Sequence, residues 1–368
     1  MSRLLKLVLL LGVALILIGV LAVGALFVIS GGHPLDYAQT TLIRLSLQSK
    51  QEALDQPISS DTTSTRFTVN SGDPPRVIGS NLYNAGLISD ANLFVDYVRA
   101  YGIDVQLQAG TYFLKHSQSI REIAAALTDS RNSQILFSII EGWRMEEVAE
   151  AIDKNPLFAF SGADFLKVVN AGATVDPTFA VKIGLPPGAS LEGFLFPNTY
   201  SLPPDVTPEQ LRDTLTAEFS KEIESAGVPA AAANESMSIF QVVALGSIVQ
   251  REAVHMDEGP KIAGVYMNRL KDNMTLDADP TVQYALGHAG DWWPQITQAD
   301  YRNTISPYNA YLNFGLPPGP IANPGLDSIL AAATPLASEY LYFQADCSGN
   351  GYHRFAKTFD EHVANSCS

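Results

Sequence analysis

The chain has 368 residues, of which 46% are hydrophobic, so it is long enough for two or three domains with substantial cores. Its formal net charge of -15 excludes nucleic acid as an expected partner, because backbone phosphates would be repelled by such a surface. The same charge argues against any binding mode that depends on a basic patch. A polymeric partner would instead be held by hydroxyl hydrogen bonds and aromatic contacts.

The first thirty residues contain an uncharged apolar run of 23 residues, Leu7 to Ile29. At about 1.5 Å per residue, this run is long enough to cross a hydrocarbon core roughly 30 Å thick. Two basic residues precede it and the next is Arg44, so the positive-inside rule predicts a cytoplasmic N-terminus and an extracytoplasmic remainder. We interpret residues 1–30 as a cytoplasmic tip and transmembrane anchor. A cleaved signal peptide is the alternative, but the apolar run exceeds the usual length and no clear cleavage site follows.

Residues 31–65 are expected to form a stalk. The segment combines a helical stretch, Tyr37 to Leu54, with the polar run PISSDTTST, which has almost nothing to bury.

An internal half-repeat follows in the region 66–183. FTVNSG (Phe67 to Gly72) and FSIIEG (Phe137 to Gly142) share a predicted strand that ends in glycine. Counting from each glycine, Ile78 and Val148 fall at the same offset, as expected if an amphipathic helix follows each strand. A second helix is predicted in both copies. Between the copies, GTYFL is a predicted strand, and a capping box precedes the next helix.

The last region, 184–368, begins with a helix start at Thr207, where threonine is the N-cap, proline follows and a glutamine reaches back. The sequence Asp279-Pro280-Thr281 repeats that pattern. We therefore expect Asp279 to cap a helix rather than to take part in chemistry. Asp277, two residues earlier, is expected to organise the loop.

One carboxylate lies on the apolar side of a helix predicted from Ser238 to Ala253. Seven residues, nearly two turns, separate Leu245 from Glu252, so both side chains project from the same face. A carboxyl group held against apolar neighbours resists ionisation and keeps a proton near neutral pH, as a glycosidase general acid must. The alternative is a helix-end glutamate that reaches the surface or pairs with Arg251 or Lys261.

Three features mark the C-terminal part. Residues 315–325, GLPPGPIANPG, contain four prolines, which exclude helix or central strand and predict a stiff extended wall of a groove. His353 has no second His or Cys at ligand spacing, so neither a metal nor another cofactor is expected. Cys347 and Cys367 are the only cysteines, and we expect them to form a disulfide in an oxidising compartment.

Seven motifs resemble those of the YceG-like endolytic murein transglycosylases, the MltG family. In many relatives the helix carrying the acid reads VEKE, whereas here its first acidic position is Gln250, so the resemblance assigns the family's catalytic glutamate to Glu252. The motifs are LEGFLFPNTY (Leu191 to Tyr200), SIVQREA (Ser247 to Ala253), IAGVYMNRL (Ile262 to Leu270), MTLDADPTVQYALG (Met274 to Gly287), SPYNAYLNFGLPPGPIANPG (Ser306 to Gly325), YLYFQAD (Tyr340 to Asp346) and YHRFAKTFDEH (Tyr352 to His362).

The resemblance implies an enzyme that cuts the MurNAc-GlcNAc bond inside peptidoglycan glycan strands and leaves 1,6-anhydro-MurNAc ends, with Glu252 acting as acid and then as base. One carboxylate suffices for this reaction, because the attacking group is the 6-hydroxyl of the substrate itself. A muramidase-type hydrolase would need a second carboxylate. Glu192 is the main rival for that role, although we expect it to line or brace the cleft. A noncatalytic peptidoglycan-binding scaffold is a further alternative, and it would not require Glu252.

The resemblance also implies residues that bind N-acetyl and hydroxyl groups, since tyrosine can both stack on a sugar face and donate a hydrogen bond. For each of them, ordinary packing is the alternative. They are Tyr311 as the strongest choice, then Tyr308, Asn309, Asn268, Gln283 and Tyr284.

The expected fold class is α+β, with an N-terminal transmembrane helix, a module of strands and paired helices, and a mixed catalytic domain. The module resembles the LysM-like modules that precede the catalytic part in this family, and the alternative is that its strands and helices merely support the catalytic domain. The catalytic domain is expected outside the cytoplasm. The expected partners are peptidoglycan glycan strands, the cytoplasmic membrane and wall-synthesis enzymes.

Overall fold

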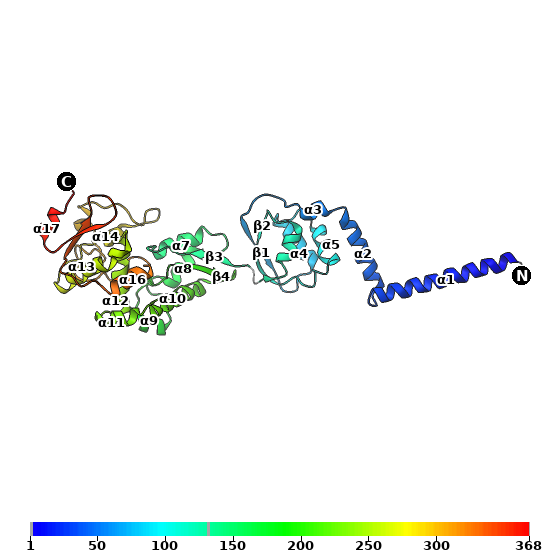
Figure 1. Ribbon diagram of the computed structural model, residues 1–368, viewed down its shortest axis with the longest axis horizontal. Helices are drawn as coiled ribbons and strands as arrows, with labels where there is room; N and C mark the ends of the chain where they lie inside the picture. Colours follow the sequence, from blue (N-terminus) through cyan, green and yellow to red (C-terminus); the bar gives the residue numbers. More distant parts are fainter. Residues whose placement is uncertain (1–2, 131–132, 368) are drawn as a thin grey trace. The chain divides into compact units, whose positions relative to one another are not determined.

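The computed structural model describes residues 3–130 and 133–367, and the chain divides into two compact units, Met1–Gln134 and Ile135–Ser368 (Figure 1). The first unit contains α1 (Arg3–Ile29), α2 (Pro34–Gln48), α3 (Gln51–Asp55), β1 (Ser64–Val69), α4 (Pro75–Asn84), α5 (Ala91–Ala100), β2 (Gly110–Lys115) and α6 (Ile120–Ala126). The second unit contains β3 (Ile135–Ser138), α7 (Met145–Asp153), α8 (Gly162–Val169), α9 (Pro177–Ile183), β4 (Thr199–Leu202), α10 (Pro208–Ser225), α11 (Val228–Asn234), α12 (Ile239–Glu252), the 3₁₀ helix η2 (Met256–Glu258), α13 (Gly259–Lys271), α14 (Asp279–Leu286), α15 (Asp300–Asn303), α16 (Leu326–Ala333), β5 (Tyr342–Ala345), β6 (His353–Ala356) and α17 (Phe359–Ala364).

The fold is α+β, as expected. The described residues form three separate two-stranded antiparallel sheets, β1 with β2, β3 with β4 and β5 with β6, and helices supply the rest of the regular structure.

The first unit has its own hydrophobic core beneath the β1-β2 sheet, to which α4 and α5 contribute. Leu47 on α2 and Leu54 on α3 are fully buried in the same core. Within the segment expected to be a stalk, α2 and α3 thus each contribute one buried leucine to this core. Most other residues of α2 and the polar run that follows α3 are exposed.

The half-repeat appears as a strand, two helices and a strand in each compact unit. β1, α4, α5 and β2 form one copy, and β3, α7, α8 and β4 form the other, with α9 inserted before the last strand. The matched positions Ile78 and Val148 are both buried. Gly72 and Gly142 have φ values of +86° and +81°, a conformation that favours glycine and accounts for the shared residue.

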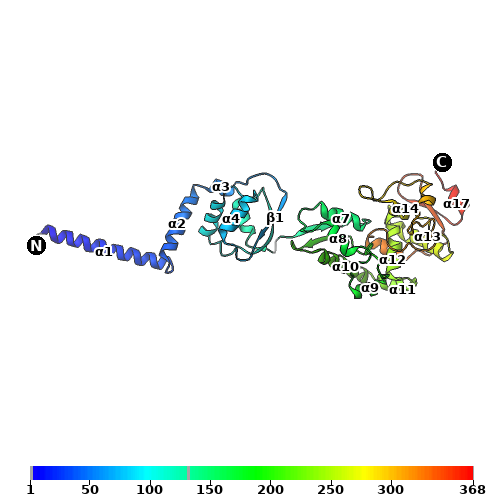
Figure 2. The ribbon, with the colours of Figure 1, turned by 180° about the vertical axis from the view of Figure 1, so that it is seen from behind.

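Helix α12 is the central helix of the second unit and packs against α13, α14 and α16 (Figures 1 and 2). It begins at the predicted position, because Ser238 forms a capping box with Gln241. Gly246 allows α16 to come close, since a Cβ at this position would lie 3.1 Å from the carbonyl oxygen of Ser328. The predicted helix is confirmed, and its apolar residues are buried.

The proline-rich segment 315–325 contains no helix or strand beyond an isolated bridge at its edge, as predicted, but it is not simply a surface wall. From Gly319 to Gly325 it is buried. Asn323 explains why: its Oδ1 accepts hydrogen bonds from the backbone of Gly193 and Leu195, both at 3.0 Å, and its Nδ2 donates to the carbonyl of Trp143 at 2.9 Å. The segment is therefore an internal strap that fixes the LEGFLFP motif.

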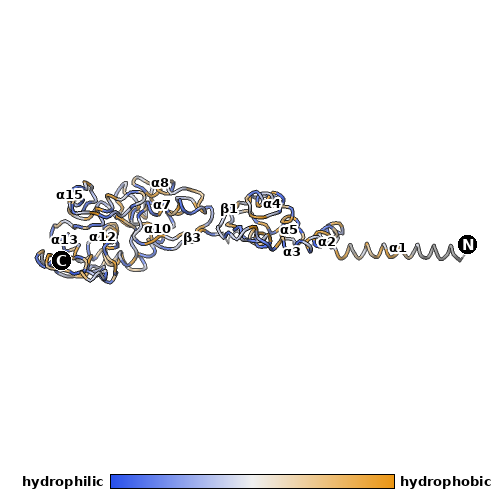
Figure 3. Tube along the Cα trace, turned by 90° about the horizontal axis from the view of Figure 1, so that it is seen from above, coloured by the Kyte–Doolittle hydropathy of each residue, from blue (hydrophilic) through white to orange (hydrophobic). Residues whose placement is uncertain are grey.

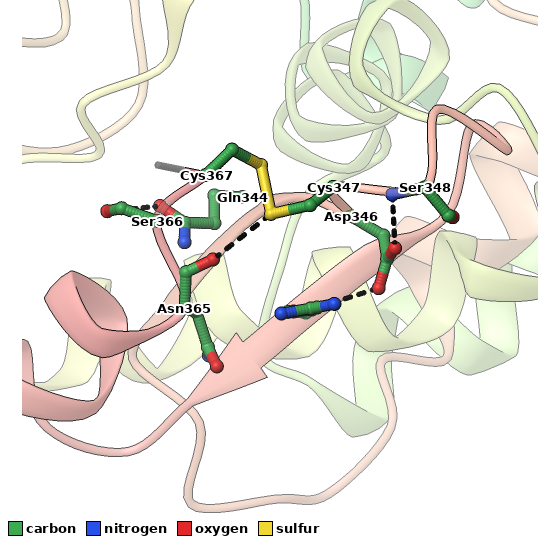
Figure 4. Close-up of a disulfide and its surroundings, with 8 residues drawn as sticks. Gln344, Asp346, Cys347, Ser348, Asn365, Ser366 and Cys367 are labelled. Carbon is green, nitrogen blue, oxygen red and sulfur yellow. Dashed lines mark hydrogen bonds and ion pairs between the residues drawn. A yellow bond between two sulfur atoms is a disulfide. The ribbon is translucent and has the colours of Figure 1, made fainter.

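The C-terminal part is a hairpin of β5 and β6 followed by α17. Cys347 and Cys367 are joined by a disulfide, so the predicted pairing is confirmed (Figure 4). The bond ties the residue after Asp346 to the tail beyond α17. Asp346 in turn accepts hydrogen bonds from the backbone of Ser348 at 2.8 Å and from Arg354 of β6 at 2.7 Å (Figure 4).

Helix α1 covers the apolar run identified in the sequence, and Figure 3 colours its end before α2 as hydrophobic. Within the described residues, no single helix is long and apolar enough to cross a membrane. Ala14–Ile29 with Pro34–Gln48, and Val228–Asn234 with Ile239–Glu252, meet the requirement only as bent pairs. The single-pass anchor expected over residues 1–30 is not confirmed.

Candidate active site

A cavity of about 520 Å³ lies in the second unit at the C-terminal end of α12. Its wall combines helices α12 to α15 with the β5-β6 hairpin and α17. The residues that line it are Glu252, Arg269, Leu276, Asp277, Asp279, Tyr301, Tyr311, Tyr342, Phe343, Gln344, Ala345, His353, Phe359 and His362.

Glu252, the last residue of α12, is partly buried on this wall. Its pKa is raised to about 7, mainly by burial; the hydrogen bond from Tyr266 lowers this pKa, and the negative charge of Asp279 contributes to raising it. The alternative pairing with Arg251 or Lys261 is not found among the described residues. These cations lie over aromatic rings instead, Arg251 at 3.9 Å from the centroid of Trp293 and Lys261 at 4.3 Å from that of Phe355.

Tyr266 on α13 is the direct partner of Glu252, and the sequence analysis missed it. Its hydroxyl donates a hydrogen bond of 2.7 Å to Oε1 of Glu252, and the side chain is almost fully buried. Burial and the neighbouring carboxylate hold the pKa of Tyr266 well above its usual range, so the phenol remains a donor. A tyrosine at a buried helical position needs a polar partner for its hydroxyl, and this requirement could have identified Tyr266 from the sequence.

Asp279 does not have the role that its sequence context predicted. Helix α14 begins at Asp279 itself, its N-cap is Ala278, and no side-chain cap is made. The carboxylate instead accepts hydrogen bonds from Tyr311 at 2.5 Å and from Tyr301 at 3.4 Å. The expectation of a cap is therefore wrong, because two tyrosines distant in sequence bind the carboxylate on the cavity wall.

Tyr311, the strongest candidate for a sugar-binding residue, lines the cavity. Its ring stacks on that of Tyr301, with centroids 4.1 Å apart and planes 11° apart. Burial and the bond to Asp279 raise the pKa of Tyr311, so its hydroxyl stays protonated. Tyr301 belongs to none of the recognised motifs and was not anticipated.

Tyr308 and Tyr284 form a separate aromatic group outside the 520 Å³ cavity. Their ring centroids are 4.7 Å apart, and the guanidinium of Arg144 lies 4.0 Å from the ring of Tyr284. Tyr308 lines a different pocket of about 300 Å³, next to Phe240 and residues 318–320 of the proline-rich segment. The structure does not place these two tyrosines beside Glu252.

The three amide residues predicted to bind sugar hold the backbone instead. Asn309 is fully buried; its Nδ2 donates to the carbonyls of Tyr301 and Thr304, and its Oδ1 accepts from the backbone of Tyr311. Asn268 donates to the carbonyls of Ser338 and Tyr340. Gln283 donates to the carbonyl of Pro294 at 3.0 Å. None of the three lines the cavity, because their polar atoms are used to shape loops around it.

Glu192 also lies away from the cavity. It is 1% exposed, and its carboxylate accepts hydrogen bonds from the backbone of Met145 at 3.1 Å and from Asn323 at 3.3 Å. Burial and the nearby Glu146 raise its pKa well above the usual range. Glu192 thus braces the start of α7.

Asp277 reaches the cavity wall but is paired. Arg269 donates to it at 2.8 Å and Thr275 at 2.7 Å. Its φ of +50° shows that it occupies a tight turn, which agrees with the expected loop-organising role.

The C-terminal hairpin and α17 supply much of the cavity wall, a contribution that the sequence analysis did not predict. Tyr342, Phe343, Gln344, His353 and His362 all line the cavity. His353 is fixed by Glu258, whose Oε2 lies 2.9 Å from its Nδ1. The disulfide therefore stabilises a segment that borders the site.

Comparison with known proteins places this chain in a family. The YceG-like family profile matches residues 67–367. An endolytic murein transglycosylase of Bacillus subtilis is 31% identical over 324 residues, covering 84% of this chain and 86% of that protein. One from Streptococcus pneumoniae is 29% identical and covers 86% of this chain and 60% of that protein. The crystal structure of a protein described as yceG-like from Listeria monocytogenes has 30% identity and a TM-score of 0.54, covering 83% of this chain and all of that one. The chain belongs to the YceG-like family.

Proposed function

We propose that this chain is an endolytic murein transglycosylase, the activity for which its relatives from Bacillus and Streptococcus are named. It cleaves the MurNAc-GlcNAc bond within peptidoglycan glycan strands and leaves 1,6-anhydro-MurNAc ends. Glu252 acts first as the acid and then as the base. The observation that carries the proposal is a carboxyl group with a pKa of about 7 on the wall of a cavity of about 520 Å³.

The reaction requires two proton transfers at Glu252, one away from it and one back to it. Protonated Glu252 gives its proton to the glycosidic oxygen, so the bond to C1 of MurNAc breaks with the leaving group neutral. The resulting carboxylate then accepts the proton of the 6-hydroxyl as that oxygen bonds to C1. A pKa near neutrality suits both steps, because neither protonation state of the carboxyl group is strongly disfavoured.

Tyr266 supports this cycle by orienting the carboxyl group. It donates to Oε1, and in the described part of the chain no protein group is bonded to Oε2. Oε2 is therefore the atom that we assign to the substrate.

A muramidase would need a second carboxylate to activate water or to attack C1. Glu192 does not suit that role, since it is buried and already bonded to Met145 and Asn323. On the cavity wall, Asp277 is already paired with Arg269, so Asp279 is the carboxylate that such a hydrolase would use. The products distinguish the two reactions.

The decisive experiment digests purified sacculi with the full-length protein and analyses the products by mass spectrometry. We expect anhydro ends and rapid shortening of long strands before disaccharides accumulate. Glu252→Gln should abolish cleavage, because the amide cannot donate a proton, whereas Glu209→Gln, an exposed control on α10, should not. Reducing MurNAc ends would show a hydrolase instead, and near-normal turnover by Glu252→Gln would refute the assignment of the acid.

We propose further that α1 anchors the protein in the cytoplasmic membrane, with residues after it outside. The support is its length, Arg3–Ile29, and the apolar sequence it covers. A reporter fused after Ser368 should then be active only outside the cytoplasm. A reporter that is active inside the cytoplasm would contradict this topology.

We also propose that residues 66–183 provide LysM-like units that hold glycan, with wall-synthesis enzymes as further partners and residues 184–368 as the catalytic domain. The support is the strand, two helices and strand repeated in both compact units. Deleting residues 66–134, the copy in the first unit, should weaken binding to sacculi while leaving cleavage of short soluble glycans measurable. Unchanged sacculus binding would assign the repeat a supporting role.

A further inference from the structure

Asp279 differs from Asp277 on the same cavity wall because it has no cationic partner among the described residues. Asp277 forms an ion pair with Arg269 at 2.8 Å, and Glu258 faces His353 at 2.9 Å. In the described ranges, the bonds to the side chain of Asp279 come from the hydroxyl groups of Tyr311 and Tyr301. A neutral donor orients a carboxylate without cancelling its charge. The negative charge at this point of the wall is therefore uncompensated.

The two tyrosines also hold Asp279 firmly. Their rings are stacked at 4.1 Å, and the backbone N–H of Tyr311 donates to the buried Asn309 at 2.9 Å. Asp279 itself starts α14 and lines the same cavity as Glu252. A fixed charge in a partly enclosed site acts more strongly than one in water, because no solvent has to reorganise around it during the reaction.

We propose that Asp279 is the fixed negative charge of this site. It favours the protonated form of Glu252 in the resting protein, and it favours the positive charge that develops at C1 as the glycosidic bond breaks. The effect of Asp279 on the charge at C1 rests on the proposed function, whereas its effect on Glu252 does not. Asp279 thereby acts as a positioning residue for the proton of Glu252, and it remains chemically unchanged.

The other titratable groups around Glu252 fit this assignment. Tyr266 and Arg269 come from α13, Tyr342 and His353 from the hairpin, and His362 from α17. Arg269 is occupied by Asp277 and by the backbone carbonyls of Thr275, Leu276 and Leu341. His353 is occupied by Glu258. Asp279 is the uncompensated charge among them, and it is the charge that raises the pKa of Glu252.

The test compares Asp279→Asn with Asp300→Asn in the full-length protein. Asp300 is the matched control, because it lies on α15 beside Tyr301, accepts hydrogen bonds from Thr297 and does not line the cavity. Tyr311→Phe is a second variant that keeps the charge of Asp279 but removes one donor. The carboxyl carbon of Glu252 is titrated by ¹³C NMR, with Glu252→Gln used to assign its signal, and the pH profile of sacculus cleavage is recorded in parallel.

We expect Asp279→Asn to lower the measured pKa of Glu252 by roughly half a pH unit or more and to move the alkaline limb of the activity profile by the same amount. Its limiting rate at low pH should fall by roughly tenfold to a hundredfold. Tyr311→Phe should not lower the pKa of Glu252. An unchanged Glu252 titration in Asp279→Asn, or an equal change in Asp300→Asn, overturns the proposal.

The titration of Glu252 does not require enzymatic turnover, so the proposed function and the proposed role of Asp279 can be refuted independently. If the wild type cleaves no glycan, the proposed function fails, whereas the titration still decides whether Asp279 sets the proton affinity of Glu252.

Discussion

Glu252 is held in surroundings that favour its protonated form, and this placement lowers the stability of the folded protein at the pH values where Glu252 ionises. Its pKa of about 7 in the folded protein exceeds the ordinary value of 4.5. A raised pKa means that the stability present below about pH 4.5 is lost as the pH rises through 7. A group that has been placed for proton transfer is thus a source of instability at neutral and alkaline pH.

Glu252→Gln should therefore stabilise the protein at pH 8 and leave its stability unchanged near pH 4. The gain in the free energy of unfolding should be on the order of 2–3 kcal/mol at most, since one pKa unit corresponds to about 1.4 kcal/mol and Glu252 is only partly buried. Urea unfolding at both pH values measures it. Glu209→Gln, on the exposed face of α10, should show no comparable gain, and equal stability of wild type and Glu252→Gln at pH 8 would contradict the raised pKa.

Tyr266→Phe should act on the same carboxyl group in the direction opposite to Asp279→Asn. The hydroxyl of Tyr266 lowers the pKa of Glu252, so its removal raises that pKa and moves the alkaline limb of the activity profile to higher pH. The ring itself should stay in place, because it packs edge-on against Phe343 with centroids 5.6 Å apart. A limb that moves toward acid would show that the hydrogen bond has another role.

At the scale of elements, the sequence predicted the features that depend on neighbouring residues, and it missed those that depend on distant ones. Helix α12 lies between the expected ends because its apolar spacing and its Ser238 cap are both local. The role of Asp279 was missed because Asp-Pro-Thr is a genuine cap pattern, and only Tyr311, 32 residues later, shows that the carboxylate is used elsewhere. Asn309 belongs to the right motif, but a motif does not say whether a side chain faces the cavity or the loop behind it.

Asn323 should be the residue on which the proline-rich strap depends. Both ends of its amide are bonded in a fully buried setting, to Gly193, Leu195 and Trp143. Asn323→Ala leaves those backbone groups unpaired, so we expect a loss of about 3 kcal/mol in the free energy of unfolding by urea. Asn234→Ala, at the exposed end of α11, should cost much less. Similar values for the two variants would show that the strap is held by packing alone.

At the scale of the whole molecule, the disulfide was predicted because the chain has only two cysteines and an oxidising compartment was expected, and the structure confirms it. What the sequence did not reveal is its location beside the cavity, because that depends on how β5, β6 and α17 fold back onto α13. Replacing both cysteines by serine should lower the free energy of unfolding by about 3 kcal/mol in the chain-entropy description.

The same double variant should also raise KM for glycan more than it lowers kcat, since Gln344 and His362 line the cavity whereas Glu252 lies on a different element. Steady-state kinetics on soluble glycan and a urea titration measure both effects. An unaltered KM would show that the C-terminal segment keeps its position without the bond.

The chain leaves the ribosome in a reducing compartment, where Cys347 and Cys367 remain thiols. The bond between them joins the ends of the segment that contributes His353, Phe359 and His362 to the cavity wall. If the chain is exported as proposed, the disulfide forms only after export, so synthesis and the closure of this bond are separated in time. For the proposed activity, this order of events would delay full cleavage of the cell wall until the two cysteines near the C-terminus are oxidised.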